Sequence, residues 1–316
     1  MLAVGVVVAV AIFGVGRSYF SPRVGLWASV LFYTTPLVSW LSSTTYIDLA
    51  VALFLFTALT AFLRWESTRA HGWLVITGLL AGEALGAKLT AVFGLFPLGA
   101  VLLWRLLANG AATPLVCLKY VGGGVLSGGL VALPWFAVPW VLTGNPVFPF
   151  FNAFFQSPAW LAENTTLDAG AFGLGTSLAS LGRLPFSLTF DTGRFGIGVP
   201  AGALGASLLM ALPMGMVWMR EGPCAGRILV VWGVGYMLLW ALVVQYARYF
   251  IPLLPIVVLL GASAARVFPS PFPWVALPVY VSFALMLVAQ GGMISAQSWS
   301  IPDRFPIRLL LGLESN

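Results

Sequence analysis

The chain contains 316 residues, of which 60% are apolar and only 8% are charged. Its net charge is +6 and its mean hydropathy is +1.00. Soluble domains carry roughly 25% charged residues, so these few charges cannot cover a water-facing surface, and the soluble classes of protein are excluded. The apolar runs approach the roughly 20 residues that a helix needs to cross a bilayer, and they lack the alternation of barrel strands. We predict an all-α, polytopic transmembrane helical bundle that forms a single domain over residues 1–316.

About ten transmembrane helices are predicted along the chain. Residues 73–105 divide into two short helices, because Gly82, Gly86 and Lys88 interrupt the apolar run. Prolines such as Pro36 are expected to kink spans, since proline removes a backbone donor and neighbouring helices must satisfy the freed carbonyl. The predicted helices cover residues 1–16, 24–41, 47–63, 73–87, 89–105, 117–142, 196–219, 228–245, 250–266 and 272–290.

The basic residues are unevenly distributed between the two sides of this bundle. With the loop after the first helix in the cytoplasm, the inner loops carry nine basic and two acidic residues, and the outer segments carry six of each. Basic residues favour the cytoplasmic side, so both termini are predicted to be external. Residues 143–195 mix aromatic residues with sparse charges and are expected to form an external surface segment of short amphipathic helices. Residues 291–316 then form an external tail.

Few residues are available for metal or nucleophilic chemistry. His71 is the one histidine, which excludes His-rich metal sites and Ser-His-Asp catalysis within this chain. The two cysteines do not predict a disulfide framework. No motif predicts a nucleic-acid partner or a bound cofactor, and a divalent metal stays an open alternative. Asp168 and Asp191, in the external segment, either assist a metal or a sugar or are simply solvated.

Two charged residues at predicted helix ends are candidates for chemistry. Asp48 opens an apolar helix, where it either caps the helix through the helix dipole or orients and deprotonates an acceptor hydroxyl. Lys88 lies deep in an apolar stretch, where it either snorkels to the outer headgroups or binds an anion such as a lipid phosphate. Glu83 points roughly 140° away from Lys88 on an ideal helix, so the two pair only if the helix breaks near Gly86.

A third charged candidate, Arg248, lies between Tyr246 and Tyr249 where one predicted helix ends and the next begins. Arginine binds phosphate oxygens bidentately, and its tyrosine neighbours suit either a lipid-phosphate pocket or an aromatic belt at the membrane surface. Tyr46, just before the acid of the third predicted helix, and Asn145, in a rigid turn after a span, are further candidates for substrate binding. The alternative for the Asn145 turn is a loop that only terminates its helix.

Asp48, Lys88 and Arg248 all fall on the predicted outer face. We therefore expect them to line one outward-facing cavity with acidic and basic walls, with residues 143–195 over it. Such a cavity suits an anionic, lipid-linked substrate.

Five short motifs carry a family resemblance, and their order and sidedness agree with this topology. They are the short inner loop and Ala-rich span of residues 17–28, the Pro…Tyr-x-Asp passage of residues 36–48, the glycine-rich helix pair with a lysine of residues 78–90, the Gly-Asn-Pro-Val-Phe-Pro run of residues 144–149, and the Arg-Tyr…Pro…Pro span of residues 248–255. Over roughly residues 5–265 the chain resembles the polytopic glycosyltransferases of the GT-C type. It is most similar to the bacterial relatives of dolichyl-phosphate-mannose protein mannosyltransferases.

The resemblance implies a hexosyltransferase in the bacterial inner (plasma) membrane, with its active side facing the outside or periplasm. Such an enzyme transfers a sugar with inversion from a polyprenyl-phosphate donor to a glycan, lipid or protein acceptor. Asp48 matches an acid of the family that follows its third or fourth span. Lys88 and Arg248 match basic positions that hold the lipid phosphate, and Tyr46, Tyr249 and Asn145 are expected beside the substrate.

One departure from the family affects the expected activity. The principal catalytic acid of the family lies in the first external loop, after a first span, and this chain is expected to begin beyond both. The chain is then an N-terminally shortened fragment, a chain with a wrongly chosen start, or a degenerate relative, and its activity as given stays open.

Two other functional classes are compatible with the charges. A transporter or flippase for a lipid-linked or anionic solute should show an internal repeat and charges near the bilayer midplane, and the sequence predicts neither. An O-antigen ligase or polysaccharide polymerase also works on the outer face with arginines and a large external loop. A non-catalytic scaffold is the remaining alternative.

Overall fold

The computed structural model describes residues 1–108, 114–160, 172–196, 199, 201–264 and 284. Every regular element in this part of the chain is helical, which confirms the all-α prediction. The elements are α1 (Leu2–Tyr19), α2 (Pro22–Thr34), α3 (Pro36–Ser42), α4 (Asp48–Thr68), α5 (Gly72–Ala87), η1 (Leu89–Ala91), α6 (Val92–Ala108), α7 (Pro114–Thr143), α8 (Asn152–Phe155), α9 (Leu178–Phe190), η3 (Thr192–Phe195), α10 (Ser207–Glu221), α11 (Cys224–Val243), η4 (Ala247–Leu253) and α12 (Leu254–Ala262), where η marks a 3-10 helix.

The predicted helix over residues 24–41 is broken into two. α2 begins where the Ser21 side chain accepts a hydrogen bond from the backbone N–H of Val24 at 3.2 Å. It ends before Thr35, whose ψ of 123° is the extended conformation that proline imposes on the residue before it. Pro36 then starts α3, and the two helices meet at an angle of 68°. The predicted kink at Pro36 is confirmed.

The predicted helix over residues 196–219 is wrong in its first half, because α10 begins only at Ser207. Gly202 and Gly205 have positive φ angles of 78° and 68°, which are left-handed conformations outside a helix. The carbonyl of Ala203 accepts a hydrogen bond from the N–H of Leu37 at 3.0 Å. This non-helical turn therefore ties the start of α10 to α3.

Five described helical segments are long and apolar enough to cross a membrane, and the bent pair of α2 and α3 makes a sixth. They are α1, α4, η1 with α6, the Tyr120–Thr143 part of α7, and α11. α5 and the helical run of residues 247–262 are apolar but shorter. The chain is thus an integral membrane protein. The count of ten spans stays a prediction, since all but one residue of 272–290 lies outside the described residues.

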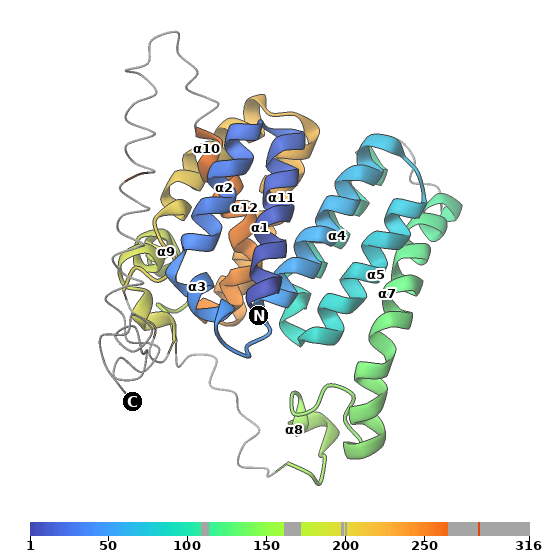
Figure 1. Ribbon diagram of the computed structural model, residues 1–316. Helices are drawn as coiled ribbons and strands as arrows, with labels where there is room; N and C mark the ends of the chain where they lie inside the picture. Colours follow the sequence, from blue (N-terminus) through green and yellow to red (C-terminus); the bar gives the residue numbers. More distant parts are fainter. Residues whose placement is uncertain (109–113, 161–171, 197–198, 200, 265–283, 285–316) are drawn as a thin grey trace, which may run out of the picture.

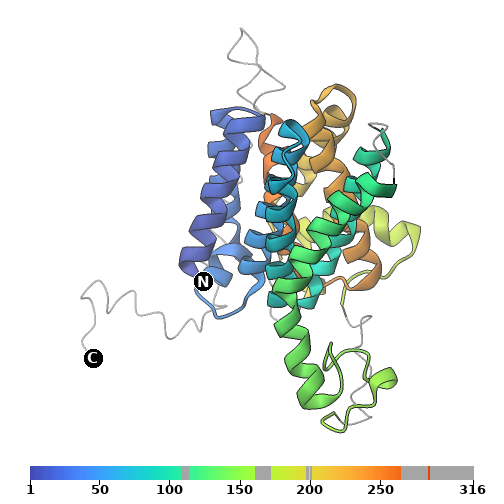
Figure 2. The same ribbon diagram turned by 90° about the vertical axis from the view of Figure 1, so that its right-hand side faces the viewer.

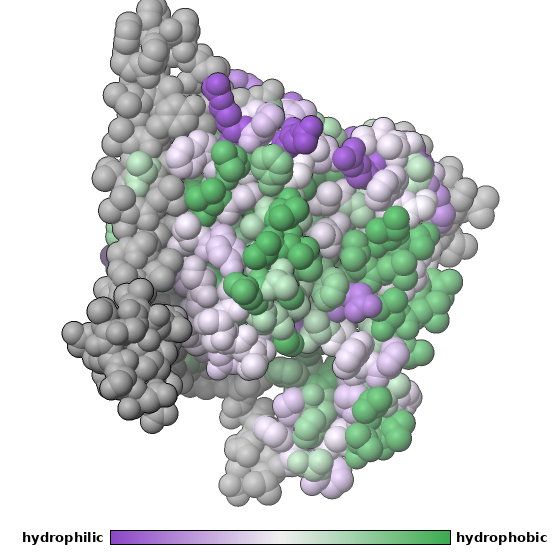
Figure 3. Space-filling model, viewed as in Figure 1, coloured by the Kyte–Doolittle hydropathy of each residue, from purple (hydrophilic) through white to green (hydrophobic). Residues whose placement is uncertain are grey.

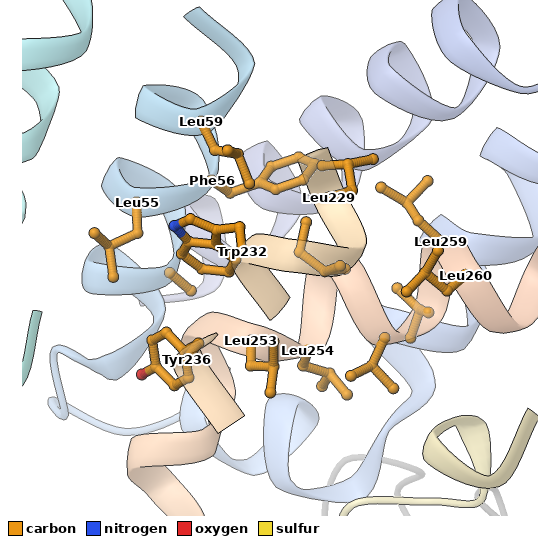
Figure 4. Close-up of a cluster of buried hydrophobic side chains, with 14 of the residues drawn as sticks. Leu55, Phe56, Leu59, Leu229, Trp232, Tyr236, Leu253, Leu254, Leu259 and Leu260 are labelled. Atoms are coloured by element: carbon orange, nitrogen blue, oxygen red, sulfur yellow. The ribbon is translucent and has the colours of Figure 1, made fainter. Parts of the chain in front are cut away.

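In the bundle, α4 lies between two groups of helices (Figures 1 and 2). α1, α2, α10, α11 and α12 lie on one side of it, while α5 and α7 lie on the other, with α7 at the outer edge against α5. The first group and α4 enclose a continuous apolar core (Figure 4). Within it the indole of Trp232, from α11, donates a hydrogen bond to the carbonyl of Gly94 at 2.9 Å, which links α11 to α6.

The two ends of the bundle carry different charges. Residues 17–23, 64–71, 105–108 and 220–227 gather at one end, here called the basic end. Glu66 is its centre: its Oε1 accepts hydrogen bonds from Arg69 at 2.7 Å and from Arg105 at 2.5 Å, and the free thiol of Cys224 lies 3.8 Å away. In Figure 3 the basic end is at the top: hydrophilic side chains lie along this edge, and apolar side chains cover the middle of the molecule. Which end faces the cytoplasm stays a prediction.

Helices α5 and α7 approach each other through glycines. A Cβ placed on Gly82 would lie 2.3 Å from the carbonyl oxygen of Gly128, and one on Gly78 would lie 2.2 Å from that of Gly124. Both obstacles are backbone atoms, which cannot rotate away. Small residues at such positions let membrane helices pack at short range, so this contact fixes α5, the helix that carries the site lysine at its end.

We predict that Gly82→Ala separates α5 from α7 and lowers the free energy of unfolding in detergent by about 1–3 kcal/mol, the usual cost of overpacking. Gly129→Ala is the matched control on α7, because a Cβ there meets nothing within 4 Å. It should leave stability unchanged or raise it slightly, since alanine favours helix. Equal unfolding curves for the two variants would contradict the glycine contact.

Candidate functional site

The first turn of α4 and the break after α5 bring an acid and a base together. α5 ends at Ala87, and Lys88 has an extended conformation (φ −162°, ψ 132°) that separates α5 from η1. The ammonium of Lys88 donates a hydrogen bond to Oδ1 of Asp48 at 2.6 Å. Asp48 begins α4, where the helix dipole favours a carboxylate. The predicted division of residues 73–105 is confirmed, and the partner of Lys88 is Asp48 instead of Glu83.

Arg248 reaches the same carboxylate from a distant part of the sequence. Its Nη1 lies 3.9 Å from Oδ2 of Asp48. The turn that carries Arg248 is held by two side chains of α11: the Tyr236 hydroxyl donates to the carbonyl of Tyr249 at 2.7 Å, and the Trp240 indole donates to the carbonyl of residue 246 at 3.0 Å. α11 therefore sets the position of η4 against α4.

Aromatic rings flank both cations of this cluster. The guanidinium carbon of Arg248 lies 3.9 Å from the ring centre of Tyr46 and 5.1 Å from that of Tyr246. The Lys88 ammonium lies 4.3 Å from the ring centre of Tyr249. A cation over a ring face is attracted by its quadrupole. The rings thus hold the two cations in place while occupying none of their hydrogen-bond donors.

The cluster contains two cations and one carboxylate, and it is largely buried. The exposed fractions of the side chains are 3% for Asp48, 21% for Lys88 and 17% for Arg248. Oδ2 of Asp48 and Nη1 of Arg248 are buried without a hydrogen-bond partner among the described residues. Among the residues that the structure describes, one positive charge of the cluster is left without a counter-charge, and such a charge is costly at low dielectric. An incoming anion would remove that cost.

Asn145 has a different environment. It is fully buried in the turn after α7, where its Nδ2 donates to the carbonyl of Phe150 and its Oδ1 accepts from the N–H of Val147, both at 2.9 Å. The side chain is engaged on both sides in organising this turn. Substrate binding by Asn145 stays a prediction, and its observed contacts are those of the helix-terminating loop.

Two further acids of the sequence analysis make no described contact with the cluster. Glu83 is exposed on α5, and Asp191 is exposed and paired with Arg194. Asp168 lies outside the described residues. Within the part of the chain that the structure describes, no three His, Cys, Asp or Glu side chains gather as ligands for a metal ion.

Comparison with known proteins relates this arrangement to one family. Residues 1–155 match the family described as dolichyl-phosphate-mannose-protein mannosyltransferase. No curated protein matches the chain. Two solved structures of ArnT from Cupriavidus metallidurans share its fold: the one bound to undecaprenyl phosphate has a TM-score of 0.62 at 18% identity, and the apo one has a TM-score of 0.60 at 19% identity.

The chain has the GT-C type membrane fold, and its residues 1–155, just under half of its length, are similar to the dolichyl-phosphate-mannose-protein mannosyltransferases. The likeness to ArnT covers 93% of this chain and 49% of ArnT, so the chain spans about half the length of that protein. The family match includes Asp48 and Lys88, while Arg248 lies beyond it. The suspected family resemblance and the GT-C fold are confirmed, and the roles of individual residues stay predictions.

Sequence reasoning missed one group of residues next to the cluster. Gln245 is 4% exposed and hydrogen-bonds to residues 174 and 175, far away in the sequence. The ring of Phe172 packs edge-on against Tyr246 with ring centres 4.9 Å apart. The pair of glycines at positions 173 and 175 is a turn signal that the sequence contains, but nothing local indicates which residue the turn would contact.

We predict that Asp48→Asn destabilises the protein, because it leaves Lys88 and Arg248 without a counter-charge. Breaking a buried ion pair costs about 3–5 kcal/mol, and the partial exposure of Lys88 reduces this, so we expect a loss of roughly 1–3 kcal/mol. Adding Lys88→Met should recover part of the loss. A double-mutant cycle of unfolding in detergent measures the coupling.

The control for this cycle is Asp191→Asn, which removes an exposed acid paired with Arg194. Such surface pairs contribute about 0–1 kcal/mol, so its unfolding should stay close to that of the unmodified protein. Strictly additive losses for Asp48→Asn and Lys88→Met would contradict the ion pair.

Proposed function

We propose that the chain is a polyprenyl-phosphate-dependent membrane glycosyltransferase of the hexosyltransferase type. In this proposal Lys88 and Arg248 bind the phosphate of the lipid-linked sugar donor, and Asp48 accepts the proton of the acceptor hydroxyl. Tyr46 and Tyr249, which flank the two cations, form the walls of the phosphate site. The acceptor is a glycan, a lipid or a protein.

The observation that carries the proposal is the surplus positive charge of the cluster. Two cations face one carboxylate at the ends of apolar helices, with distances of 2.6 Å and 3.9 Å to its two oxygens. An anionic ligand is the natural counter-charge for the surplus, and phosphate suits both an ammonium and a planar guanidinium. The apolar helices around the cluster suit the hydrocarbon chain of such a ligand.

The proposed reaction uses each of the three charges once. The acceptor oxygen attacks the anomeric carbon of the sugar from the side opposite the phosphate, which inverts its configuration. The bond between the anomeric carbon and the phosphate oxygen breaks, and its electron pair stays on the phosphate. Lys88 and Arg248 stabilise that developing charge. The acceptor proton passes to the Asp48 carboxylate.

In the unliganded chain the Lys88 ammonium occupies Oδ1 of Asp48 through a hydrogen bond of 2.6 Å. A bound phosphate competes for the same ammonium. Since the Lys88 side chain is 21% exposed and sits on a helix break, it has room to turn toward the phosphate. Donor binding would then free Asp48 for the acceptor.

The known relatives support the class of donor. The name of the matched family specifies a dolichyl-phosphate-mannose donor and a protein acceptor. One ArnT structure was solved with undecaprenyl phosphate bound. Both lipids are long polyprenyl-type chains that end in phosphate. We therefore favour this chemical class of donor for the present chain, while the sugar itself is left to experiment.

We also propose that the cluster faces the outside of a bacterial inner membrane. The basic end lies opposite the Asp48 end, since Glu66, near the other terminus of α4, contacts the arginines there. Basic residues favour the cytoplasm. A transporter is less well supported, because its charges should lie near the middle of the spans, whereas Asp48 and Lys88 lie at helix ends.

We predict that the purified chain binds undecaprenyl phosphate, and that Lys88→Met and Arg248→Met each weaken binding at least ten-fold, because each removes one charge-assisted contact worth roughly 1.5–3 kcal/mol. Binding is measured as a ligand-dependent thermal shift in detergent. Transfer of a radiolabelled sugar from a panel of polyprenyl-phosphate donors is measured in membranes, where Asp48→Asn should abolish transfer and leave the shift in place.

Arg23→Met is the matched control, since Arg23 is an exposed arginine at the basic end, opposite the cluster. It should bind undecaprenyl phosphate like the unmodified chain. Absence of binding by the unmodified chain would overturn the phosphate site. Binding without transfer of any sugar from any donor would overturn the glycosyltransferase and favour a lipid-phosphate carrier.

A further inference from the structure

We infer that Gln245 is a positioning residue: by holding residues 172–175 against the end of α11, it fixes the turn that presents Arg248 to the phosphate. The inference rests on the proposed function, since it assigns Gln245 a purpose in the binding of the lipid phosphate. It adds a residue that touches none of the three charged groups of the cluster in the described contacts.

Gln245 uses both ends of its side-chain amide. Its Nε2 donates to the carbonyl of Ala241, within the last turn of α11, and to the carbonyl of Gly175, both at 2.8 Å. Its Oε1 accepts a hydrogen bond from the N–H of Leu174 at 2.7 Å. With 4% exposure these bonds are shielded from water. The amide therefore joins a helix end to a loop some 70 residues earlier in the chain.

The loop is shaped to fit around this amide. Gly173 and Gly175 have φ angles of 93° and 81°, a region that residues with a Cβ rarely adopt. A Cβ on Gly173 would lie 2.1 Å from Oε1 of Gln245. The N–H of Gly173 in turn donates to the carbonyl of Arg194 at 2.8 Å. The loop is thus held from two sides, by η3 and by Gln245.

The residue after Gln245 transmits this arrangement to Arg248. Tyr246 has the ring of Phe172 on one side at 4.9 Å and the guanidinium of Arg248 at 5.1 Å. Its ring centre is also 5.2 Å from that of Tyr249, on which the site lysine rests. A displaced loop would release the ring of Tyr246 and, with it, one of the two rings that orient the guanidinium.

A residue that only stabilises the fold and a residue that positions Arg248 have different signatures. Loss of a structural hydrogen bond lowers the amount of folded protein and leaves the affinity of the folded fraction unchanged. Loss of a positioning contact lowers affinity, and the loss is not additive with a change at Arg248, since the two act on one interaction.

The test compares Gln245→Met with Trp232→Phe in the full chain. Methionine keeps a similar volume and removes all three hydrogen bonds of Gln245. Trp232→Phe removes a buried hydrogen bond of α11, to Gly94 of α6, that does not involve η4 or the 172–175 loop. We expect Gln245→Met to weaken undecaprenyl phosphate binding five- to ten-fold, and Trp232→Phe to lower the melting temperature without changing the dissociation constant.

Two further variants complete the design. The double variant Gln245→Met, Arg248→Lys should bind undecaprenyl phosphate at most about two-fold more weakly than Arg248→Lys alone. A small additional loss of this kind shows that the two residues are coupled. Phe172→Leu, which removes the ring contact with Tyr246 and leaves Gln245 intact, should weaken binding in the same direction. This variant carries the test where Gln245→Met fails to fold.

The outcomes separate the two proposals. If the unmodified chain does not bind undecaprenyl phosphate, the proposed function fails. If it binds and Arg248→Lys weakens binding, while Gln245→Met and Phe172→Leu bind normally, the proposed function stands and the positioning role of Gln245 is overturned. Additive effects of Gln245→Met and Arg248→Lys would also overturn it.

Discussion

The arrangement of the site depends on one buried carboxylate. The Asp48 side chain is 3% exposed at the start of a helix within an apolar bundle, where an isolated charge would be very costly. Two cations meet that cost, and each requires a departure from regular helix: Lys88 lies on the extended residue between α5 and η1, and Arg248 lies in the 3-10 turn that follows α11. The break after α5 and the 3-10 turn after α11 therefore occur where they can supply a counter-charge.

The sequence was a good guide wherever the physical cause was local. The absence of charge, the length of the apolar runs and the prolines indicate an all-helical membrane protein, and Pro36 marks a true break. The sidedness of the helices predicted that Asp48, Lys88 and Arg248 lie at the same level, because all three end helices on the same side of the bundle. Their hydrogen-bonded and ring contacts required three-dimensional packing to see.

Local patterns failed where contacts between distant segments determine the conformation. Residues 201–206 continue an apolar run, yet two left-handed glycines and a bond from Leu37 to Ala203 keep them out of α10. Gln245 resembles an ordinary polar residue at a helix end, and its partners lie some 70 residues away. Neither the loop it holds nor its link through Tyr246 to the site has a short-range signal.

The two acids near the ends of α4 are separated by about the thickness of a membrane core. Asp48 and Glu66 are eighteen residues apart, which is about 27 Å along a helix. Each is held by two basic side chains, Lys88 and Arg248 at one end and Arg69 and Arg105 at the other. The hydrocarbon core of a bilayer is about 30 Å thick. α4 therefore has charged residues about one core thickness apart, which favours a span whose Asp48 end lies at the level of the lipid headgroups, and the proposed donor site requires that depth for a lipid phosphate to reach it from its own leaflet.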